Sequence, residues 1–496
     1  MSYDEAPVET RLVINGEWRP ASGGRTYEIH NPARPSEVVG MAAAASPDDV
    51  DAAMLAAQAA FPAWSSLSYQ ERGAYLTKIN EAVVADADEL QDRIKLFTRE
   101  HGKILRESGM ELTRLGARFD LVAGYAERLA EDEKLPGPPF DTVITRQPFG
   151  VATLIVPWNW PLSILGAKLP QALMAGNTVV VKPSSYSALA PMITLRKMAE
   201  VLPPGVLNVV TGSASEIGDT LLTHPVVRKI NFTGGIETGR HVMRTAAQNL
   251  THVTLELGGN DAAIVLEDAN LDDEAFVRMF MGSFMTMGQV CMAIKRLYVH
   301  ESRFDEVVDG FSAVLSRQVV GDGTQEGVTM GPVNNKEQYD IVGGFLAEAR
   351  NAGADVRELG SARDEAEFDE GYFFKPTLVV KPEPGLKIVK DEQFGPALPI
   401  LTFKDDEEVV ALANDSNYGL CSSVWTEDAE RALSVARRLE AGYTYLNAHG
   451  PAAQDSRAPF GGFKQSGFGR NLGYEGVLEF QEYHSISSAP GWLFGG

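Results

Sequence analysis

Residues 151–181 read VATLIVPWNWPLSILGAKLPQALMAGNTVVV and contain two short apolar runs rich in β-branched residues, Val151 to Val156 and Thr178 to Val181. Runs of this length and composition are typical of strands that helices cover on both faces. Similar runs follow at Leu207 to Val210, Lys229 to Phe232 and Val253 to Leu257. Amphipathic segments such as Ala190 to Val201 separate them, so the alternation predicts a Rossmann-like α/β unit with a parallel sheet.

A second alternating region extends from Asp261 to about residue 445 and predicts another α/β domain, with the boundary near Gly258-Gly259. Its strand candidates are Ala262 to Leu266, Arg296 to Val299 and Leu378 to Val380. The chain before about residue 130 is predicted to be mostly helical. There, Asp48 to Phe61 and Gln70 to Glu89 carry apolar residues at helical spacing.

Two strand-like pieces, Thr142 to Gln147 and Leu478 to Ser487, fit neither domain. Paired together they would form a small β arm for oligomerisation, although two ordinary surface strands fit the pattern equally well. We therefore expect a dinucleotide-binding domain over 1–124 and 148–258 and a catalytic thiol domain over 259–458. Residues 125–147 and 459–496 would be oligomerisation or bridging segments.

Composition limits the classes of partner. The chain has 496 residues, with 44 Lys and Arg against 67 Asp and Glu and a net charge of −23, which disfavours nucleic acid and anionic membranes. Two cysteines cannot form a disulfide framework, and the acidic start Met1 to Glu5 does not resemble a signal peptide. Because the sequence also lacks a long uninterrupted apolar stretch, we expect a cytoplasmic protein that binds small molecules or itself.

Cys291, in Gly288-Gln289-Val290-Cys291, lies 35 residues after Glu256 in the run Leu255 to Asn260. A thiolate attacks carbonyl carbons, and a nearby carboxylate can take a proton from water. The pair therefore suits a covalent acyl intermediate that is later hydrolysed. The alternative is a cysteine that serves only as a small buried apolar side chain.

Three further motifs suggest a ligand site at strand ends. Gly234-Gly235 follows a strand and should open a helix, where backbone N–H groups can approach a pyrophosphate. Lys182 closes another strand and could hold a ribose hydroxyl or a phosphate. Asn159 lies between Pro157-Trp158 and Trp160-Pro161, which restrict the backbone, so its side-chain amide could be held as an oxyanion donor. The simpler alternatives are a tight turn, a solvated lysine and an Asx-turn.

Seven motifs in order along the chain resemble the NAD(P)-dependent aldehyde dehydrogenase superfamily, non-acylating type. The resemblance runs nearly end to end. The motifs are Pro157-Trp158-Asn159-Trp160-Pro161, Lys182-Pro183-Ser184, Phe232-Thr233-Gly234-Gly235, Leu255-Glu256-Leu257-Gly258-Gly259, Gly288-Gln289-Val290-Cys291, Glu392-Gln393-Phe394-Gly395-Pro396 and Pro459-Phe460-Gly461-Gly462-Phe463-Lys464-Gln465-Ser466-Gly467.

The resemblance implies a catalytic role for each predicted residue. Cys291 would add to the aldehyde, and Asn159 with the Cys291 backbone N–H would stabilise the oxyanion of the thiohemiacetal. Hydride transfer to nicotinamide would leave a thioester that Glu256 hydrolyses to the carboxylic acid. Lys168 matches a family lysine near the active centre, with a solvated helix lysine as the alternative.

The resemblance also implies NAD or NADP as cofactor. Glu392 would bind the nicotinamide ribose and Phe394 would pack beside the nicotinamide ring. Ser185, where NAD-preferring members often have a glutamate, leaves NADP use open. Gly235 replaces a frequent serine, and Asn471 replaces a glutamate proposed for proton relay. The full set of implied cofactor residues is Val156, Pro157, Trp158, Lys182, Ser184, Ser185, Gly212, Phe232, Thr233, Gly234, Gly235, Leu257, Glu392 and Phe394.

By the same resemblance, the residues facing the substrate are mainly bulky and apolar and favour a hydrophobic or aromatic aldehyde. They are Trp160, Ile164, Met285, Val290, Met292 and Phe460, with parts of Ala448 to Ala458. His449, Gln454, Asp455 and Arg457 could bind a polar tail or form a surface cluster. Arg296 is expected to be structural. A homodimer or homotetramer is expected.

Alternatives to this function remain. A CoA-acylating semialdehyde dehydrogenase is one, although such relatives usually lack the glutamate represented by Glu256. A non-catalytic binding or structural protein on the same scaffold is another, and the presence of Cys291, Glu256 and Asn159 argues against it. No metal is expected, because two cysteines without paired ligand spacing do not suit a zinc alcohol dehydrogenase.

Overall fold

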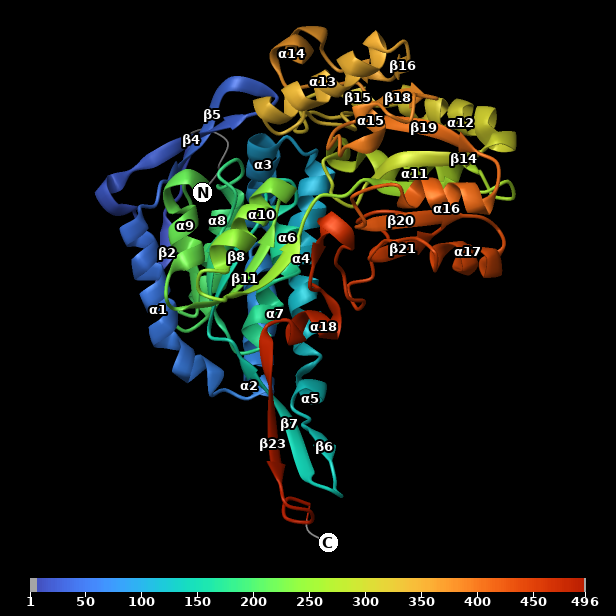
Figure 1. The fold of residues 1–496 in the computed structure, drawn as a ribbon. Coiled ribbons are helices and arrows are strands. Elements are labelled where there is room, and N and C mark those ends of the chain that lie inside the picture. The colour runs from blue at the N-terminus through green and yellow to red at the C-terminus, as the bar shows by residue number, and fades with distance from the viewer. Residues whose placement is uncertain (1–6, 495–496) are drawn as a thin grey trace.

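The computed structural model describes residues 7–494, so the acidic start Met1 to Glu5 lies outside the described residues. Two α/β lobes lie side by side, and a narrow β arm projects from them (Figure 1). The predicted α/β class is therefore confirmed. Within residues 7–494, every helix is too short or too polar to cross a lipid bilayer.

The first lobe is built on an eight-stranded sheet in the order β22-β12-β11-β8-β9-β10-β2-β3. Its five central strands are parallel, and each predicted run lies in one of them with ends shifted by at most two residues. They are β8 (Val151–Ile155), β9 (Thr178–Lys182), β10 (Leu207–Val209), β11 (Val227–Thr233) and β12 (His252–Glu256). The flanking antiparallel strands are β2 (Leu12–Ile14), β3 (Glu17–Arg19) and β22 (Gly467–Phe468).

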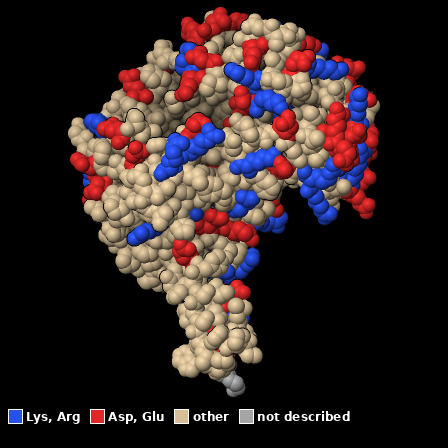
Figure 2. Space-filling model, viewed as in Figure 1, with Lys and Arg blue, Asp and Glu red and all other residues tan. Residues whose placement is uncertain are grey.

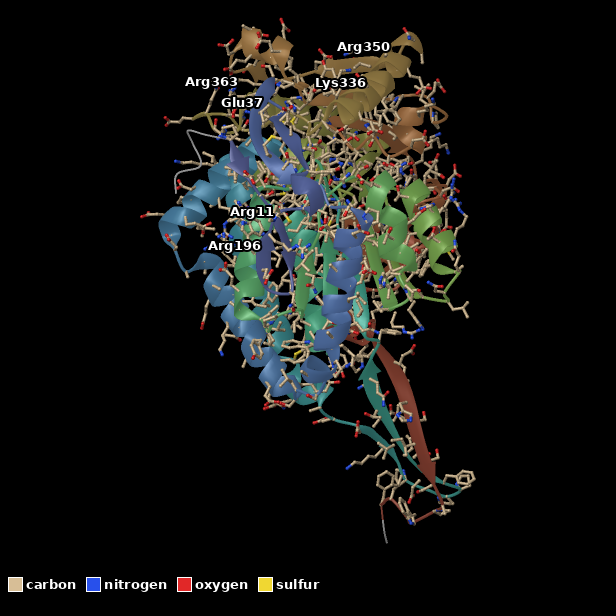
Figure 3. All side chains as sticks on the ribbon, turned by 90° about the vertical axis from the view of Figure 1, so that its left-hand side faces the viewer. Arg11, Glu37, Arg196, Lys336, Arg350 and Arg363 are labelled. Atoms are coloured by element: carbon tan, nitrogen blue, oxygen red, sulfur yellow. The ribbon has the colours of Figure 1, made fainter. Side chains whose placement is uncertain are left out.

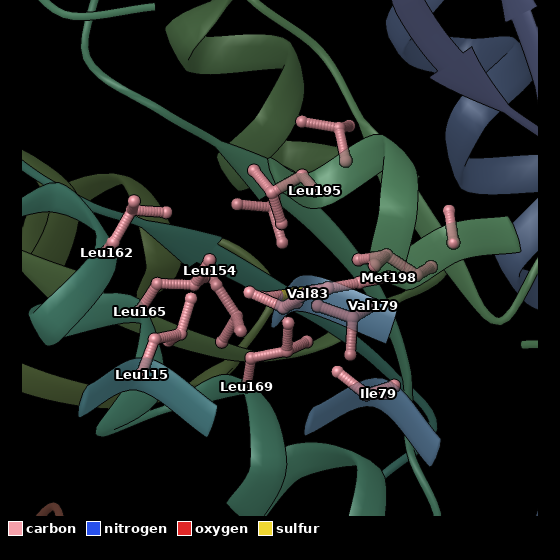
Figure 4. Close-up of a cluster of buried hydrophobic side chains, with 14 of the residues drawn as sticks. Ile79, Val83, Leu115, Leu154, Leu162, Leu165, Leu169, Val179, Leu195 and Met198 are labelled. Carbon is pink, nitrogen blue, oxygen red and sulfur yellow. The ribbon is translucent and has the colours of Figure 1, made fainter. Parts of the chain in front are cut away.

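Helices cover this sheet because their apolar faces meet the buried apolar side chains of its strands. In Figure 4, Ile79 and Val83 from α2 (Tyr69–Val84) and Leu115 from α4 (Leu105–Ala123) pack in one buried cluster with strand and helix residues of the lobe. The other covering helices are α1 (Pro47–Ser65), α3 (Ala87–His101), α6 (Pro161–Gly166), α7 (Leu169–Met174), α8 (Ala190–Val201), α9 (Ala214–Thr223) and α10 (Ile236–Ala246).

The prediction of a mostly helical N-terminal region is wrong for its first part. Short strands occupy that part: β1 (Val8–Glu9), β2, β3, β4 (Thr26–Asn31) and β5 (Arg34–Ala43). Their mixed polar and apolar residues gave no clear period-2 signal. The predicted helix Gln70 to Glu89 is in fact two helices, because Asp86 accepts from the backbone N–H groups of Asp88 and Glu89 and starts α3.

The second lobe contains a seven-stranded sheet in the order β16-β18-β19-β14-β13-β20-β21, parallel except for β16. The three predicted runs lie in β13 (Asp261–Val265), β14 (Ile294–His300) and β18 (Thr377–Val380). The remaining strands are β16 (Asp355–Glu358), β19 (Ala397–Phe403), β20 (Cys421–Trp425) and β21 (Tyr443–Leu446), and the main helices are α11 (Asp273–Phe284), α12 (Phe304–Ser316), α13 (Lys336–Asn351), α16 (Asp406–Asn414) and α17 (Ala429–Ala436).

The arm is a three-stranded sheet of β6 (Glu133–Leu135), β7 (Asp141–Pro148) and β23 (Gln481–Ser488). Strands β7 and β23 pair in antiparallel register from Pro148 opposite Gln481 to Asp141 opposite Ser488. Of the two alternatives left open by the sequence, the structure shows the paired strands. The second strand starts later than expected, because Leu478 ends the helix α18 (Gly473–Leu478). The view turned by 90° also shows the arm extending away from the lobes and from the labelled Lys336 and Arg350 (Figure 3).

Candidate active site

The carboxyl ends of the five parallel strands in the first lobe carry nearly all of the predicted cofactor residues. Trp158 follows β8, Lys182 ends β9, Gly212 follows β10, Gly234 follows β11 and Leu257 follows β12. Strand β8 has β9 on one side and β11 on the other, so the chain order reverses direction beside β8. Ligands of open α/β sheets bind at such a switch point, outside the carboxyl ends of the strands.

The turn after β11 leaves backbone donors available. Gly234 donates its N–H to the Glu256 carbonyl at 3.1 Å, which ties the turn to β12. Gly235 then caps α10, and no side chain caps this helix. A Cβ built on Gly235 would meet nothing within 4 Å. An uncapped helix N-terminus beside an open glycine fits the pyrophosphate of a dinucleotide.

Lys182 is buried at the end of β9, and its Nζ donates to the Pro183 carbonyl at 3.3 Å. Burial lowers the pKa of this ammonium to about 8. It forms no ion pair with a carboxylate in the described part of the chain. Ser184 and Ser185, just beyond, are partly exposed. A buried lysine without a counter-ion suits the hydroxyls or phosphate of a ligand better than a role in folding.

Residues from the second lobe approach the same edge. The Phe394 ring packs edge-on against Trp158, with ring centroids 5.5 Å apart. Glu392 accepts the Gly259 N–H at 3.0 Å, and a Cβ on Gly258 would lie 2.3 Å from its carboxylate. Burial, offset in part by Lys295, raises the pKa of Glu392 to about 7. Glu392 and Phe394 therefore lie where the predicted nicotinamide end would be.

The loop that precedes Cys291 contains three successive residues in the left-handed backbone conformation. Thr286, Met287 and Gly288 have successive φ values of 50, 60 and 69°. Two of the three are not glycine, so surrounding contacts must hold this conformation. The Thr286 N–H donates to Glu107 at 2.8 Å, and the Lys295 ammonium donates to the Gly288 carbonyl at 2.5 Å.

Gln289 and the thiol complete this loop. The Gln289 side chain donates to the Thr286 carbonyl at 3.0 Å and accepts the Asn334 N–H at 2.9 Å. These contacts fix Cys291, which is partly exposed toward a cavity. Burial, together with the charges of Glu392 and Glu256, raises the pKa of the Cys291 thiol above its usual value. The thiol therefore needs a base before it can act as a nucleophile.

Asn159 lies beside this thiol loop. It is buried, and its Nδ2 donates to the Gln289 carbonyl at 2.9 Å. A side-chain amide has two N–H donors, and Asn159 also lines the cavity that holds Cys291. The bond to Gln289 thus orients the amide, and the side chain of Asn159 lines the cavity beside Cys291.

Glu256 ends β12 and is 4% exposed, with one carboxylate oxygen that has no hydrogen-bond partner among the described residues. Burial raises its pKa to about 8, against the opposing effect of Lys168, Arg470 and Asn471. The backbone of β22 pairs with β12 here, with Gly467 opposite Glu256. The predicted Pro459–Gly467 motif therefore supports the strand that carries the carboxylate.

Lys168 is fully buried, so the alternative of a solvated helix lysine is wrong. Its ammonium donates to the Asn231 side chain, whose amide in turn donates to Asn471 at 2.8 Å. Burial lowers the pKa of Lys168 to about 7, while Glu256 acts to raise it. Lys168, Asn231, Asn471 and Glu256 thus form one buried polar group next to the thiol.

One cavity of about 450 Å³ brings the predicted catalytic residues together. Cys291, Glu256, Asn159 and Lys168 all line it. Five of the six predicted substrate residues also line it: Trp160, Ile164, Val290, Met292 and Phe460. Met285 is instead buried in the apolar cluster behind these side chains.

The predicted polar residues of the last loop separate into three environments. Gln454 lines the cavity. Asp455 and Arg457 pair with each other at 2.7 Å on the surface. His449 is buried and binds the Ser423 hydroxyl at 2.9 Å, so it is neither a tail ligand nor part of a surface cluster. Arg296 donates to the carbonyls of three residues and is structural, as expected.

Helix α4 supplies a wall of the cavity that the sequence did not indicate. Met110, Arg114, Leu115, Arg118 and Leu121 line it. They are one, three or four residues apart, as on one side of any amphipathic helix, and this spacing does not show which surface the helix faces. The contribution of α4 therefore had no signal in the sequence.

Comparison with known proteins agrees with this geometry. A family model described as "Aldehyde dehydrogenase family" matches residues 18–486. The chain belongs to the aldehyde dehydrogenase family. Its resemblance to this family, expected from the seven motifs, is confirmed.

Members of the aldehyde dehydrogenase family resemble this chain over nearly its whole length. A chloroplastic betaine aldehyde dehydrogenase from Beta vulgaris is 38% identical, covering 98% of this chain and 99% of that protein. The crystal structure of a Staphylococcus aureus betaine aldehyde dehydrogenase with NAD+ is 32% identical, with a TM-score of 0.89 over 97% of this chain and 95% of that one. An NADP-dependent enzyme from E. coli is 33% identical, with a TM-score of 0.91 over 97% and 98%.

Proposed function

We propose that this aldehyde dehydrogenase oxidises an aldehyde to the carboxylic acid with NAD or NADP, through a covalent intermediate on Cys291. The observation that carries the proposal is the single cavity lined by Cys291, Asn159 and Glu256. This shared lining supports the proposal, because a nucleophile, an oxyanion donor and a base would then surround the carbon of a bound aldehyde.

The first step is addition of the thiolate to the aldehyde. Glu256 takes the thiol proton, the sulfur–carbon bond forms, and the carbonyl π electrons move to oxygen. The free N–H of Asn159 stabilises this oxyanion. Loss of one such donor typically slows catalysis by about 100-fold to 1,000-fold. Glu392, Phe394 and the uncapped turn at Gly235 would hold the cofactor, which would supply the acceptor for the hydride lost from the former aldehyde carbon.

Hydrolysis of the thioester completes the reaction. Glu256 first releases the thiol proton to solvent. It then takes a proton from water as the water oxygen bonds to the acyl carbon, and the Cys291 sulfur leaves as thiolate. The unpartnered Glu256 oxygen supports this assignment, because a buried carboxylate oxygen without a donor can accept from a water molecule. The presence of this base favours water over CoA as the acceptor.

The choice between NAD and NADP depends on the end of β9. Ser185 there neither holds the 2′-hydroxyl strongly nor repels a 2′-phosphate. Similar proteins include one crystallised with NAD+ and one described as NADP-dependent. We propose that both cofactors are accepted, and that Ser185→Glu suppresses use of NADP.

The substrate is proposed to have an apolar or aromatic body. Trp160, Ile164, Val290, Met292 and Phe460 form an apolar surface between the thiol and the rest of the cavity. The names of similar proteins point to betaine aldehyde or aminoaldehydes instead. The cytoplasmic location stays a prediction.

The arm is proposed to mediate a homodimer or homotetramer. Its segments expose large apolar side chains: Leu135, Phe140, Tyr483, Ile486 and Trp492. In Figure 2 the lower part of the arm shows almost no charged atoms on the visible face. A projecting sheet with exposed apolar side chains, and with few charges on the visible face of its lower part, is typical of a protein interface.

The enzymatic proposal is tested by following reduced nicotinamide with aromatic and aliphatic aldehydes, with NAD and with NADP, in the presence and absence of CoA. We expect CoA-independent turnover by the wild type and none by Cys291→Ala. If the two proteins behave alike with every aldehyde, the chain is not an aldehyde dehydrogenase in function. Turnover that requires CoA would instead support the acylating alternative.

A further inference from the structure

Two arginines on one face of α4 line the substrate cavity. Arg114 and Arg118 are four residues apart, which places them one above the other on the helix. Arg114 is exposed, whereas Lys168 and Glu256 beside the thiol are buried. Arg114 therefore lies on the solvent side of the cavity, and Arg118, one helical turn away, is less exposed.

Neither guanidinium is neutralised by the protein. Arg118 donates to the Ser163 carbonyl and to the Gln454 amide oxygen at 3.4 Å, which uses two of its five N–H donors. In the part of the chain that the structure describes, Arg114 has no hydrogen-bond acceptor and neither arginine has a carboxylate partner. These contacts hold Arg118 in place and leave donors on both arginines for a ligand.

Glu111 does not serve as a counter-ion at this position. Its charge favours the charged form of Arg118. However, one of its oxygens accepts the N–H groups of Leu162 and Ser163, and the other pairs with the Lys103 ammonium. Both oxygens of the Glu111 carboxylate are thus already bound by other groups in the core.

The unbalanced charge makes this position attractive to an anion. Burial, together with the repulsion of Arg114, lowers the pKa of Arg118 to about 10. A bound carboxylate would relieve that repulsion and could accept from both guanidinium groups. Apart from Lys168 and Glu256 near the thiol, Arg114 and Arg118 are the only charged residues among those described that line the cavity.

We infer that Arg114 and Arg118 select aldehydes with an apolar body and a carboxylate at the far end. The aldehyde carbon would lie at Cys291, the body against Ile164 and Phe460, and the carboxylate at the arginines. This specificity rests on the proposed function. It also separates the chain from relatives named for betaine aldehyde, whose quaternary ammonium the two arginines would repel.

The test compares 4-carboxybenzaldehyde with 4-formylbenzamide, which has the same shape and no charge. The readout is the ratio of kcat/KM for the two aldehydes, measured by formation of reduced nicotinamide. We expect the ratio to fall about 10-fold or more in Arg114→Gln and in Arg118→Gln. The intrinsic reactivity of each aldehyde cancels when the ratios of variant and wild type are compared.

Arg106→Gln is the matched control, because Arg106 is an exposed arginine of the same helix that lies outside the cavity. It should keep the wild-type ratio. Arg118→Lys, which keeps the charge and loses the planar donors, should retain part of the preference. Thermal unfolding of each variant separates a loss of selectivity from a loss of folded protein.

Unsubstituted benzaldehyde separates failure of the proposed function from failure of the carboxylate site. If no aldehyde is oxidised, the proposed function fails. If benzaldehyde is oxidised but the ratio is the same in the wild type, Arg114→Gln and Arg118→Gln, only the carboxylate site is overturned. A wild type that prefers betaine aldehyde to 4-carboxybenzaldehyde would also overturn it.

Discussion

Glu256 combines two requirements that oppose each other. It must be buried to act on a water-excluded thioester, and burial favours its neutral, inactive form. The resulting pKa of about 8 lies well above that of an ordinary glutamate, although Lys168 opposes the shift. A general base with a pKa near the working pH is typical of enzymes.

This pKa predicts the pH dependence of thioester hydrolysis. The base must be ionised, so the rate should rise about tenfold per pH unit below 8 and level off above it. Rapid-mixing measurement of acyl-enzyme decay from pH 6 to 10 would show this. Glu256→Gln should be slower by about 100-fold to 10,000-fold and nearly flat with pH. An unchanged midpoint in that variant would assign the titration to another group.

Lys168 should set the position of that midpoint. Lys168 and Glu256 titrate as a pair, because the charged form of each favours the charged form of the other. Lys168→Met removes the ammonium that favours ionised Glu256, so it should raise the carboxyl pKa and move the midpoint of hydrolysis to higher pH. The measurement is the same decay experiment, with circular dichroism to verify folding. A variant that is slower at every pH by one constant factor would indicate a role limited to packing.

At the scale of secondary-structure elements, the pairing of β22 with β12 holds the catalytic carboxylate in place. Gly467 has φ 117°, and a Cβ at this position would lie 2.0 Å from the Leu255 carbonyl oxygen. Neither the conformation nor the space admits a side chain. The glycine is therefore required by the sheet next to Glu256.

We expect Gly467→Ala to cost at least about 1–3 kcal/mol in the free energy of unfolding and to lower activity in parallel. Gly218→Ala in α9 is the matched control, because its Cβ would meet nothing within 4 Å. That change should stabilise the protein by about 0.5–1 kcal/mol. Denaturant titration would measure both, and equal effects would contradict the steric argument.

For the whole molecule, the arm is the feature that the two lobes do not explain. Its strands come from the middle and the end of the chain and expose apolar side chains without covering either lobe (Figures 1 and 3). Apolar side chains exposed together on a projecting sheet are typical of an interaction surface. Association with a second copy would bury this surface.

Ile486→Lys should therefore weaken the oligomer. Ile486 is 45% exposed on β23, and Leu55 on α1 is 48% exposed, so Leu55→Lys is a control of matched exposure. Light scattering should show smaller particles for Ile486→Lys only. The proposal is overturned if the wild type is a monomer and removal of residues 478–496 does not lower its stability.

Local sequence was sufficient for the central strands, the Rossmann-like unit, the arm strands and the group Cys291, Asn159 and Glu256. Apolar runs of strand length can be recognised within a short segment of sequence. The same is true of motifs whose binding or reactive residues are neighbours in the chain. The family also followed from such motifs, because their order along the chain is itself sequence information.

Only the tertiary structure decided which distant residues meet. It buried Lys168 against Asn231 and Asn471, withdrew Met285 and His449 into the core, and directed Arg114 and Arg118 into the cavity. It also formed strands before residue 44 from segments without clear periodicity. The physical reason is the same in each case. The spacing of residues along the sequence determines which face of a helix or strand a side chain occupies, but only the packing of helices and strands determines what that face contacts.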